Sequence, residues 1–98
     1  MALVEISIIP LGTSTPSVSE HIAVSLKPLQ KSGLKYTITP MGTVIEGDLD
    51  TIMDTVRQMH EACFKKDVQR VVTTIKIDDR RDKPATIESK VQSVREKL

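Results

Sequence analysis

Aromatic residues are almost absent from this 98-residue chain, which contains one Tyr, one Phe and no Trp. Proteins that bind single-stranded nucleic acid stack bases on aromatic side chains, so this class is disfavoured. The chain also lacks a charge excess, since 14 Lys and Arg residues balance 13 Asp and Glu residues. A duplex-binding domain normally carries a marked basic excess. These two absences argue against nucleic acid as a partner.

Cysteine occurs once, at Cys63. A single cysteine excludes an intramolecular disulfide and any CxxC metal or redox site in this chain. Residues 1–5 have no basic segment leading into a long apolar run, so a signal peptide is not expected. No apolar run approaches the roughly 20 residues that cross a bilayer. We therefore expect a cytoplasmic protein that does not bind membranes.

Hydrophobic periodicity predicts four strands and three helices. Strands are expected over residues 3–10, 34–39, 43–46 and 70–78, where apolar and β-branched residues dominate. The first helix has a capping-box spacing from Ser17 to Glu20, followed by Val18, Ile22, Leu26 and Leu29 at helical intervals. That helix contains Pro28, which should kink it or end its regular part, and Gly33 is expected to stop it.

The second and third helices follow the third and fourth strands. Asp48 is a good N-cap for the second helix, whose apolar stripe includes Cys63. The segment 82–84 (Asp-Lys-Pro) is expected to open the third, with a narrow stripe of Ile87, Val91, Val94 and Leu98. This last helix, at 83–98, could cover its own domain or a neighbouring subunit.

The element order is β-α-β-β-α-β followed by an extra helix. Residues 3–39 and 43–78 form two similar βαβ halves, and right-handed crossovers place both of their helices on one sheet face. Residues 1–98 are thus predicted to form one α+β domain, a ferredoxin-like sandwich with a four-stranded antiparallel sheet. Because a domain of this size buries only about 60–65% of its unfolded surface, self-association is a common way to enlarge its thin stability margin.

Helices on one face leave the other face of the predicted sheet open, and side-chain alternation assigns residues to each. The helix-facing set is Val4, Ile6, Ile8, Tyr36, Ile38, Ile45, Val71, Thr73, Ile75 and Ile77. The open-face set is Glu5, Ser7, Ile9, Lys35, Thr37, Thr39, Val44, Glu46, Val72, Thr74 and Lys76. A purely structural interface is usually more apolar at its centre, so this mixture suits a small polar or cationic ligand beneath a partner subunit. A hydrogen-bonded dimer interface without ligand explains the same pattern and stays open.

No residue set in the sequence predicts catalysis or metal binding. His21 and His60 have no partners at metal-ligand spacing, and His60-Glu61 is half of a zinc motif without its second histidine. Cys63 is expected to be a core residue. An enzyme needs an activated nucleophile, an acid–base pair or a metal, and none can be assembled by spacing. We predict a non-enzyme that uses no cofactor.

Several segments together resemble one known family. They are residues 8–14, 36–47, 70–78, 81–83 and 90–94, spread over nearly the whole chain, and Pro-Met-Gly-Thr…Glu-Gly at 40–47 is the most specific. They resemble the small thiamine-binding protein family, formerly uncharacterised. The resemblance implies a ferredoxin-like domain with an added C-terminal helix that assembles as dimers or tetramers through its sheets. It also implies binding of thiamine or its hydroxymethylpyrimidine part without turnover.

The resemblance makes the open face a predicted thiamine site. Thiamine has a cationic thiazolium and an aminopyrimidine with a donor–acceptor edge, so Glu46 is expected to make the charge or amine contact. Ser7, Thr37 and Thr39 are expected to supply hydrogen bonds. Thr43 is a second-rank candidate, because alternation points it away from Glu46 unless Gly42 introduces a bulge.

Three alternatives stay open beside this prediction. Glu46 could instead form a cross-strand salt bridge to Lys35 or Lys76. The protein could be a ligand-free structural or protein-interaction module, or a sensor of another small heterocycle. An aromatic stacking partner for the pyrimidine is not evident, since Tyr36 is assigned to the core face and Phe64 to a helix.

Overall fold

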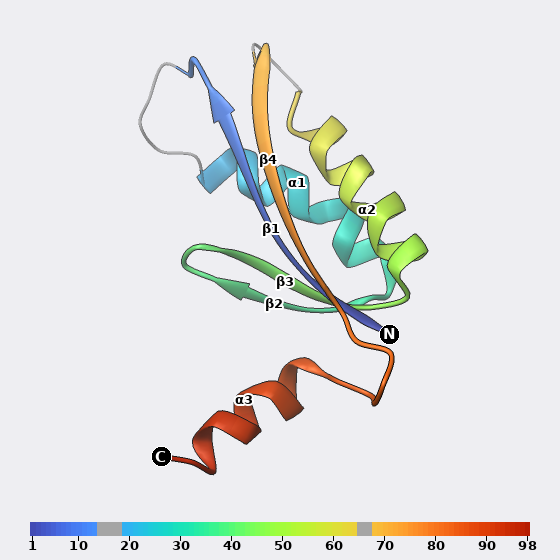
Figure 1. Cartoon of the computed structure of the whole chain (residues 1–98). Coiled ribbons are helices and arrows are strands. Elements are labelled where there is room, and N and C mark those ends of the chain that lie inside the picture. Colours follow the sequence, from blue (N-terminus) through green and yellow to red (C-terminus); the bar gives the residue numbers. More distant parts are fainter. Residues whose placement is uncertain (14–18, 65–67) are drawn as a thin grey trace.

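The computed structural model describes residues 1–13, 19–64 and 68–98. The elements in order are β1 (Ala2–Leu11), α1 (Ser19–Ser32), β2 (Lys35–Thr39), β3 (Gly42–Gly47), α2 (Leu49–Ala62), β4 (Arg70–Asp79) and α3 (Ile87–Arg95). The strands form one antiparallel sheet in the order β2-β3-β1-β4. Helices α1 and α2 lie together on one side of the sheet, and α3 lies apart beyond the end of β4 (Figure 1). The predicted ferredoxin-like order with an added C-terminal helix is confirmed.

Local sequence signals account for where α2 begins and where α1 ends. The Asp48 carboxylate caps α2 by accepting the backbone N–H of Thr51 at 3.1 Å, which also lowers the pKa of Asp48. Gly33 has φ of 77° directly after α1, the left-handed conformation expected of a helix-stopping glycine. Pro28 does not end α1, which continues to Ser32. The predicted cap at Ser17 and the stripe residue Val18 lie outside the described residues.

The hydrophobic core lies between the sheet and the two packed helices. It contains the buried side chains of Val4, Ile6, Ile8, Leu29, Ile45, Ile52, Val56, Met59 and Cys63. Tyr36 packs against this cluster, as alternation predicted, and burial raises the pKa of the Cys63 thiol. Cys63 is thus a core residue, as expected.

Three residues of the predicted core face are more exposed than expected. The register places Ile38, Ile75 and Ile77 on the helix side of the sheet, opposite or beside core residues. Nevertheless they are 59%, 38% and 46% exposed. Ile38 lies on the edge strand β2 and the other two on the edge strand β4, while the helices cover the sheet centre. Alternation assigns a face, whereas burial depends on how far the covering helices reach.

The last helix begins later than predicted. Residues 82–84 do not open it; α3 starts at Ile87, with Thr86 as its N-cap. Thr86 and Ser89 exchange hydrogen bonds in a capping box, Thr86 Oγ1 accepting the Ser89 N–H at 3.0 Å and Ser89 Oγ accepting the Thr86 N–H at 2.8 Å. Asp82 instead accepts two hydrogen bonds from Arg80, which lowers the pKa of Asp82 to about 2.

Candidate ligand site

The open face of the sheet carries the predicted polar residues in consecutive rows. Glu46 lies beside Leu3 and Lys35, and Thr37 lies beside Val44 in the next row of that face. Ser7 lies nearer the other end, opposite Thr74. Thr43 is paired with Ile6 and Ile38 in an uninterrupted register, so Gly42 introduces no bulge and Thr43 faces the helix side.

At one end of the open face, the chain itself binds the predicted charged groups. Glu46 is only 8% exposed, and its Oε1 accepts the backbone N–H of Ile87, the first residue of α3, at 2.8 Å. Lys35 Nζ donates to Glu88 Oε1 at 2.6 Å. Lys90 forms an ion pair with Asp78 of β4. We call this set of contacts the α3 anchor (Glu46, Lys35 and Asp78 with Ile87, Glu88 and Lys90).

The α3 anchor bears on the alternative assignment for Glu46. Lys35 is directly opposite Glu46 in the register, yet its hydrogen-bonded partner is Glu88. That hydrogen bond is the largest cause of the raised pKa of Lys35, and Glu46 contributes only a smaller coulombic effect. Lys76 lies opposite Glu5. Neither predicted cross-strand bridge is therefore the principal contact of Glu46, whose buried carboxylate serves the N-terminus of α3.

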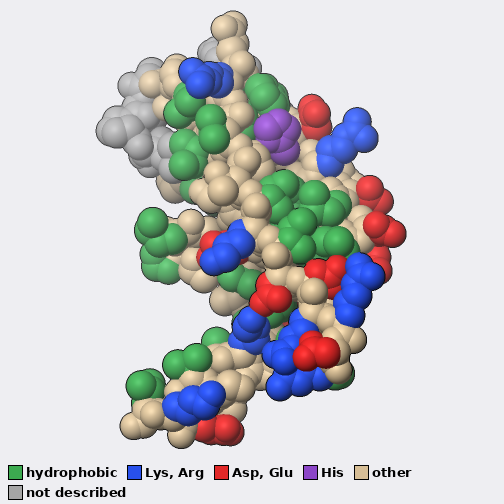
Figure 2. Space-filling model, viewed as in Figure 1, with side chains coloured by type: hydrophobic (Ala, Val, Ile, Leu, Met, Phe, Trp, Pro, Cys, Tyr) green, Lys and Arg blue, Asp and Glu red, His purple; other side chains and the backbone are tan. Residues whose placement is uncertain are grey.

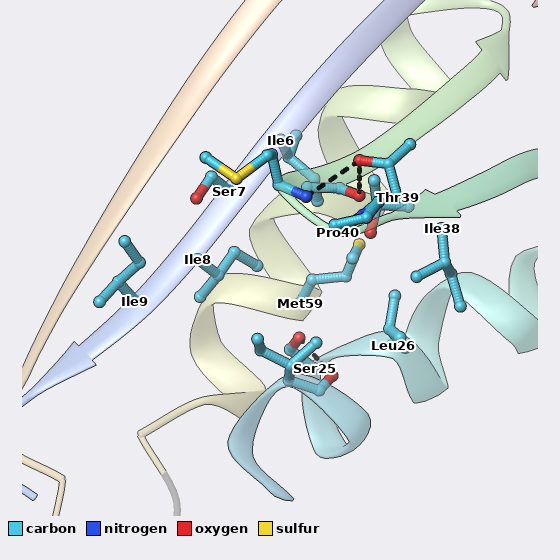
Figure 3. Close-up of a pocket in the computed structure, with 14 residues that line it drawn as sticks. Ile6, Ser7, Ile8, Ile9, Ser25, Leu26, Ile38, Thr39, Pro40 and Met59 are labelled. Carbon is cyan, nitrogen blue, oxygen red and sulfur yellow. Dashed lines mark hydrogen bonds between the residues drawn. The ribbon is translucent and has the colours of Figure 1, made fainter. Parts of the chain in front are cut away.

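A cavity of about 270 Å³ lies at the opposite end of the sheet. It is bounded by the second half of β1, one side of α1, and the turn that joins β2 to β3 (Figure 3). The lining is mostly apolar and includes four hydroxyl side chains. The lining residues are Ile6, Ser7, Ile8, Ile9, Ile22, Ser25, Leu26, Ile38, Thr39, Pro40, Met41, Gly42, Thr43 and Met59.

The cavity exists because β3 is shorter than β1. β1 pairs with β4 along its whole length, from Ala2 to Leu11, but with β3 only from Ala2 to Ile6. The chain turns away at Gly42, where an added Cβ would lie 2.7 Å from the carbonyl oxygen of Ile6. A glycine is needed for this close approach. Beyond it, the space that a longer β3 would fill is left open.

The hydroxyl groups of the cavity differ in how they are used. Thr39 Oγ1 donates to Gly42 O at 2.9 Å and accepts the Met41 N–H at 3.2 Å, which holds the β2–β3 turn in place (Figure 3). Ser25 Oγ donates to Ile22 O within α1 at 2.8 Å. Thr43 is buried and Ser7 is half-buried. The hydroxyl oxygens keep acceptor capacity after these bonds.

The structure brings together three of the five predicted site residues. Ser7, Thr39 and Thr43 line the cavity, although Thr43 reaches it from the helix side. Glu46 and Thr37 do not line it. Glu46 lies four residues along β3 from Gly42, which is about 13 Å at 3.3 Å per residue. The predicted set is thus divided between the cavity and the face that leads to the α3 anchor.

Sequence reasoning missed the contributions of the helices. Ser25 and Leu26 on α1 and Met59 on α2 line the cavity, and Figure 3 shows them around the same space as Ile8 of β1. A signal for the cavity was present in the sequence, because the predicted first strand was longer than the third. The place of Ser25 depends on how α1 crosses the sheet.

The histidines belong to other parts of the molecule. His60 Nδ1 is 2.6 Å from Thr73 Oγ1, and its ring packs edge-on against Phe64. His21 Nδ1 is buried on α1, and no hydrogen-bond partner is found for it within the described ranges. Among residues 1–13, 19–64 and 68–98, no group of three or more His, Cys, Asp or Glu residues is arranged to hold a metal ion. Nor is any helix in those ranges both long and apolar enough to cross a membrane.

Comparison with known proteins gives one consistent result. The family model described as thiamine-binding protein matches residues 4–95. UPF0045 protein YqgV of Bacillus subtilis is 47% identical, with 100% of this chain and 98% of the relative covered. A UPF0045 protein of Methanothermobacter thermautotrophicus is 43% identical over the full length of both chains.

Solved structures with the same fold agree with these matches. Hypothetical protein MJ1052 of Methanocaldococcus jannaschii superposes with a TM-score of 0.89 at 42% identity, covering 97% of this chain and 96% of that one. TM0486 of Thermotoga maritima, described as a candidate thiamine biosynthesis/salvage protein, superposes with a TM-score of 0.80 at 27% identity, covering 95% and 97%. The chain therefore belongs to the thiamine-binding protein family.

Proposed function

We propose that this protein binds thiamine or its hydroxymethylpyrimidine moiety without chemical turnover, as a cytoplasmic homo-oligomer. The observation that carries the proposal is the cavity, where three side chains predicted for ligand binding, Ser7, Thr39 and Thr43, meet in one mostly apolar space. Membership of a family described as binding proteins supports the same class of function.

The cavity has the size and chemistry for one heteroaromatic ring. Small-molecule pockets typically span about 300–1,000 Å³, so a cavity of 270 Å³ is just below that range and suits a ring with short substituents. Met41 and Met59 line it, and a thioether makes favourable contacts with ring edges and faces. These methionines supply a substitute for the aromatic partner that the sequence does not provide.

Glu46 and Thr37 remain predicted contacts for the rest of the ligand. A carboxylate near the exit of the site would favour the thiazolium cation, but Glu46 is about 13 Å along β3 from the cavity's Gly42. In this structure Glu46 Oε1 accepts the backbone N–H of Ile87 at the start of α3. We therefore expect the cavity to bind the ring, and a contact between Glu46 and the thiazolium is a separate prediction with its own test.

Self-association is supported by two apolar surfaces. On α3, Val91 is 45% and Val94 60% exposed, and Leu98, which follows the end of the helix, is 99% exposed. Ile9 and Val72 lie side by side on the open sheet face and are 45% and 43% exposed. Contiguous apolar surface of this kind commonly marks an interface. Sedimentation of the purified protein at several concentrations measures the expected association; a monomer at all concentrations would contradict it.

Thermal unfolding with a small ligand panel tests the binding proposal. The panel comprises thiamine, its phosphates, hydroxymethylpyrimidine and unrelated heterocycles. A ligand at 100 times its dissociation constant stabilises the folded state by about 2.7 kcal/mol, a shift of several degrees for a domain this small. A shift with thiamine or the pyrimidine alone is expected. Stabilisation by an unrelated heterocycle only would indicate a sensor, and no shift with any compound would favour an interaction module.

A further inference from the structure

We propose that the backbone of Ile8 in β1 hydrogen-bonds the aminopyrimidine ring directly. The Ile8 N–H donates to a ring nitrogen, and the Ile8 C=O accepts from the exocyclic amine. This inference rests on the proposed function and extends it by naming the backbone groups that recognise the pyrimidine. Its physical basis is the part of β1 beyond Ile6, where among the described strands only β4 pairs with it.

The edge arises from the difference between the two neighbours of β1. Residues Ser7 to Leu11 pair with β4, but on the other side no described strand meets β1 beyond Ile6. Ile8 is only 7% exposed, and it lines the cavity. A backbone N–H or C=O that is buried without a partner costs free energy comparable to a lost hydrogen bond. A ligand or ordered water is therefore expected beside it.

The direction of the Ile8 backbone groups follows from Ile6. The Ile6 carbonyl oxygen points toward β3, since it lies 2.7 Å from where a Cβ on Gly42 would be. In an antiparallel ladder, the N–H and C=O of one residue point to the same neighbour, and alternate residues repeat that direction. The Ile8 N–H and C=O consequently point to the β3 side, which beyond Gly42 is the cavity.

Pro10 favours a small molecule over another strand as the partner of β1 at Ile8. It is the next residue whose backbone faces the same side, and proline has no N–H to donate. Ile8 is thus the one complete donor–acceptor pair between the end of β3 pairing and Leu11. A peptide strand would need several successive pairs. A single pair is enough for one heteroaromatic ring.

The chemistry of a 4-aminopyrimidine matches this pair. Its ring nitrogen accepts a hydrogen bond and the adjacent amine donates one, in the same plane and on the same edge. The N–H and C=O of one extended residue present the complementary groups, as they do to a paired residue in a sheet. The apolar lining from Ile6, Leu26 and Met59 excludes water and strengthens such hydrogen bonds.

Two analogues of thiamine separate this inference from the proposed function. Oxythiamine replaces the 4-amine by a carbonyl and protonates the ring nitrogen, so donor and acceptor are reversed at that edge. Pyrithiamine keeps the aminopyrimidine and replaces the thiazolium by a pyridinium. Binding of each to the full chain would be measured by calorimetry, together with the ¹⁵N–¹H resonance of the Ile8 amide in the protein with and without thiamine.

We expect pyrithiamine to bind within a few-fold of thiamine and oxythiamine to bind roughly 100-fold more weakly, because two buried groups would be left mismatched. The Ile8 amide proton should shift downfield on thiamine binding, while the amide of Ile77, opposite Val4 at the far end of β4, stays unchanged. If thiamine and oxythiamine bind with equal affinity, or if thiamine binds and the Ile8 amide resonance does not move, the inference is wrong and the proposed function stands. No binding of thiamine or hydroxymethylpyrimidine would overturn both.

Discussion

The two ends of the sheet use similar polar residues in opposite ways. At the α3 anchor, Glu46 is bound by the Ile87 N–H and Lys35 by Glu88, so the chain satisfies these groups itself. At the cavity, the hydroxyls of Ser7 and Thr43 border an apolar space. On its β3 side, β1 is paired with no strand of the described ranges beyond Ile6. Figure 2 shows a dense cluster of Lys, Arg, Asp and Glu side chains where β4 ends and α3 begins, whereas the upper part carries hydrophobic patches with charged side chains around them.

This difference between the two ends indicates where a ligand would be stabilised. A carboxylate that is already hydrogen-bonded and 8% exposed gains little from a ligand unless its internal contact is given up. A backbone N–H or C=O that no described strand pairs with is expected to gain more from a ligand. Glu46 and Lys35, predicted from the sequence to contact or neighbour a cationic ligand, thus already have hydrogen-bond partners within the chain, and we expect the ligand to be stabilised mainly by neutral groups at the other end.

The largest expected effect compares two apolar residues on β1. Leu3 is 8% exposed and lies between Glu46 and Asp78, both of which bind α3, whereas Ile9 on the same face is 45% exposed. Leu3→Ala should lower the free energy of unfolding by about 2–5 kcal/mol, as for other buried leucines. Ile9→Ala should cost clearly less in dilute protein. Chemical denaturation measures both, and equal losses would mean that α3 does not cover its end of the face.

The next effect concerns the cavity and should appear only with ligand present. Ser7→Leu places a bulky side chain against the cavity and is expected to remove the stabilisation of about 2.7 kcal/mol that thiamine gives at 100 times its dissociation constant. Thr74→Leu is the matched control, because Thr74 is paired with Ser7 on β4 but does not line the cavity. Thermal unfolding measures the ligand shift in each variant. An undiminished shift in Ser7→Leu would place the ligand elsewhere.

A smaller effect tests whether Glu46 is a structural or a ligand residue. Glu46→Ala leaves the partly buried Ile87 N–H without its acceptor and should cost about 1–3 kcal/mol, while Glu46→Gln keeps an acceptor oxygen and should cost less. Glu5→Ala, at an exposed position of the same face, is the control. Denaturation and thiamine titration are run on each variant. A Glu46→Gln protein of wild-type stability but with clearly weaker thiamine binding would show that the charge contacts the cation.

The smallest effect is a pH dependence of the α3 anchor. The hydrogen bond from Lys35 lowers the pKa of Glu88 below its ordinary 4.5. A carboxylate with a lowered folded-state pKa contributes stability above its unfolded pKa, and that contribution is lost as pH falls through the folded value. The resonances of α3 amides should therefore change as pH drops below 4.5, and less so in 0.5 M salt, which screens exposed pairs. In Glu88→Gln this change should be absent. If the α3 resonances still change in that variant, the titration of another group is the cause.

Most of the fold could be predicted from the sequence because it is encoded in local patterns. The Asp48 cap, the positive φ of Gly33 and the alternation that buries Val4, Ile6 and Ile45 are all short-range signals with one physical solution. The start of α3 was missed for a local reason as well. Thr86 pairs with Ser89 where a capping box usually has Glu or Gln, and Asp82 before a proline resembled the stronger start.

The candidate site could be predicted only in part. Ser7 and Thr39 were assigned to the open face by alternation, and both border the cavity. The partner of Glu46 is 41 residues away in α3, and no pattern near Glu46 indicates it. Ser25 and Met59 enter the cavity from two different helices, and their meeting with Ile8 depends on how those helices cross the sheet.

The sequence by itself determined the element order, the faces of the strands and the absence of a metal-ligand motif, since each depends on residue type and spacing along a few turns or strands. Which polar groups already have partners within the chain follows only from the tertiary structure. The physical reason is that satisfaction of a donor or acceptor is a property of long-range contacts. Pairing of β1 with β3 ends at Ile6, and the N-terminus of α3 reaches Glu46, through distances in space that no local pattern records.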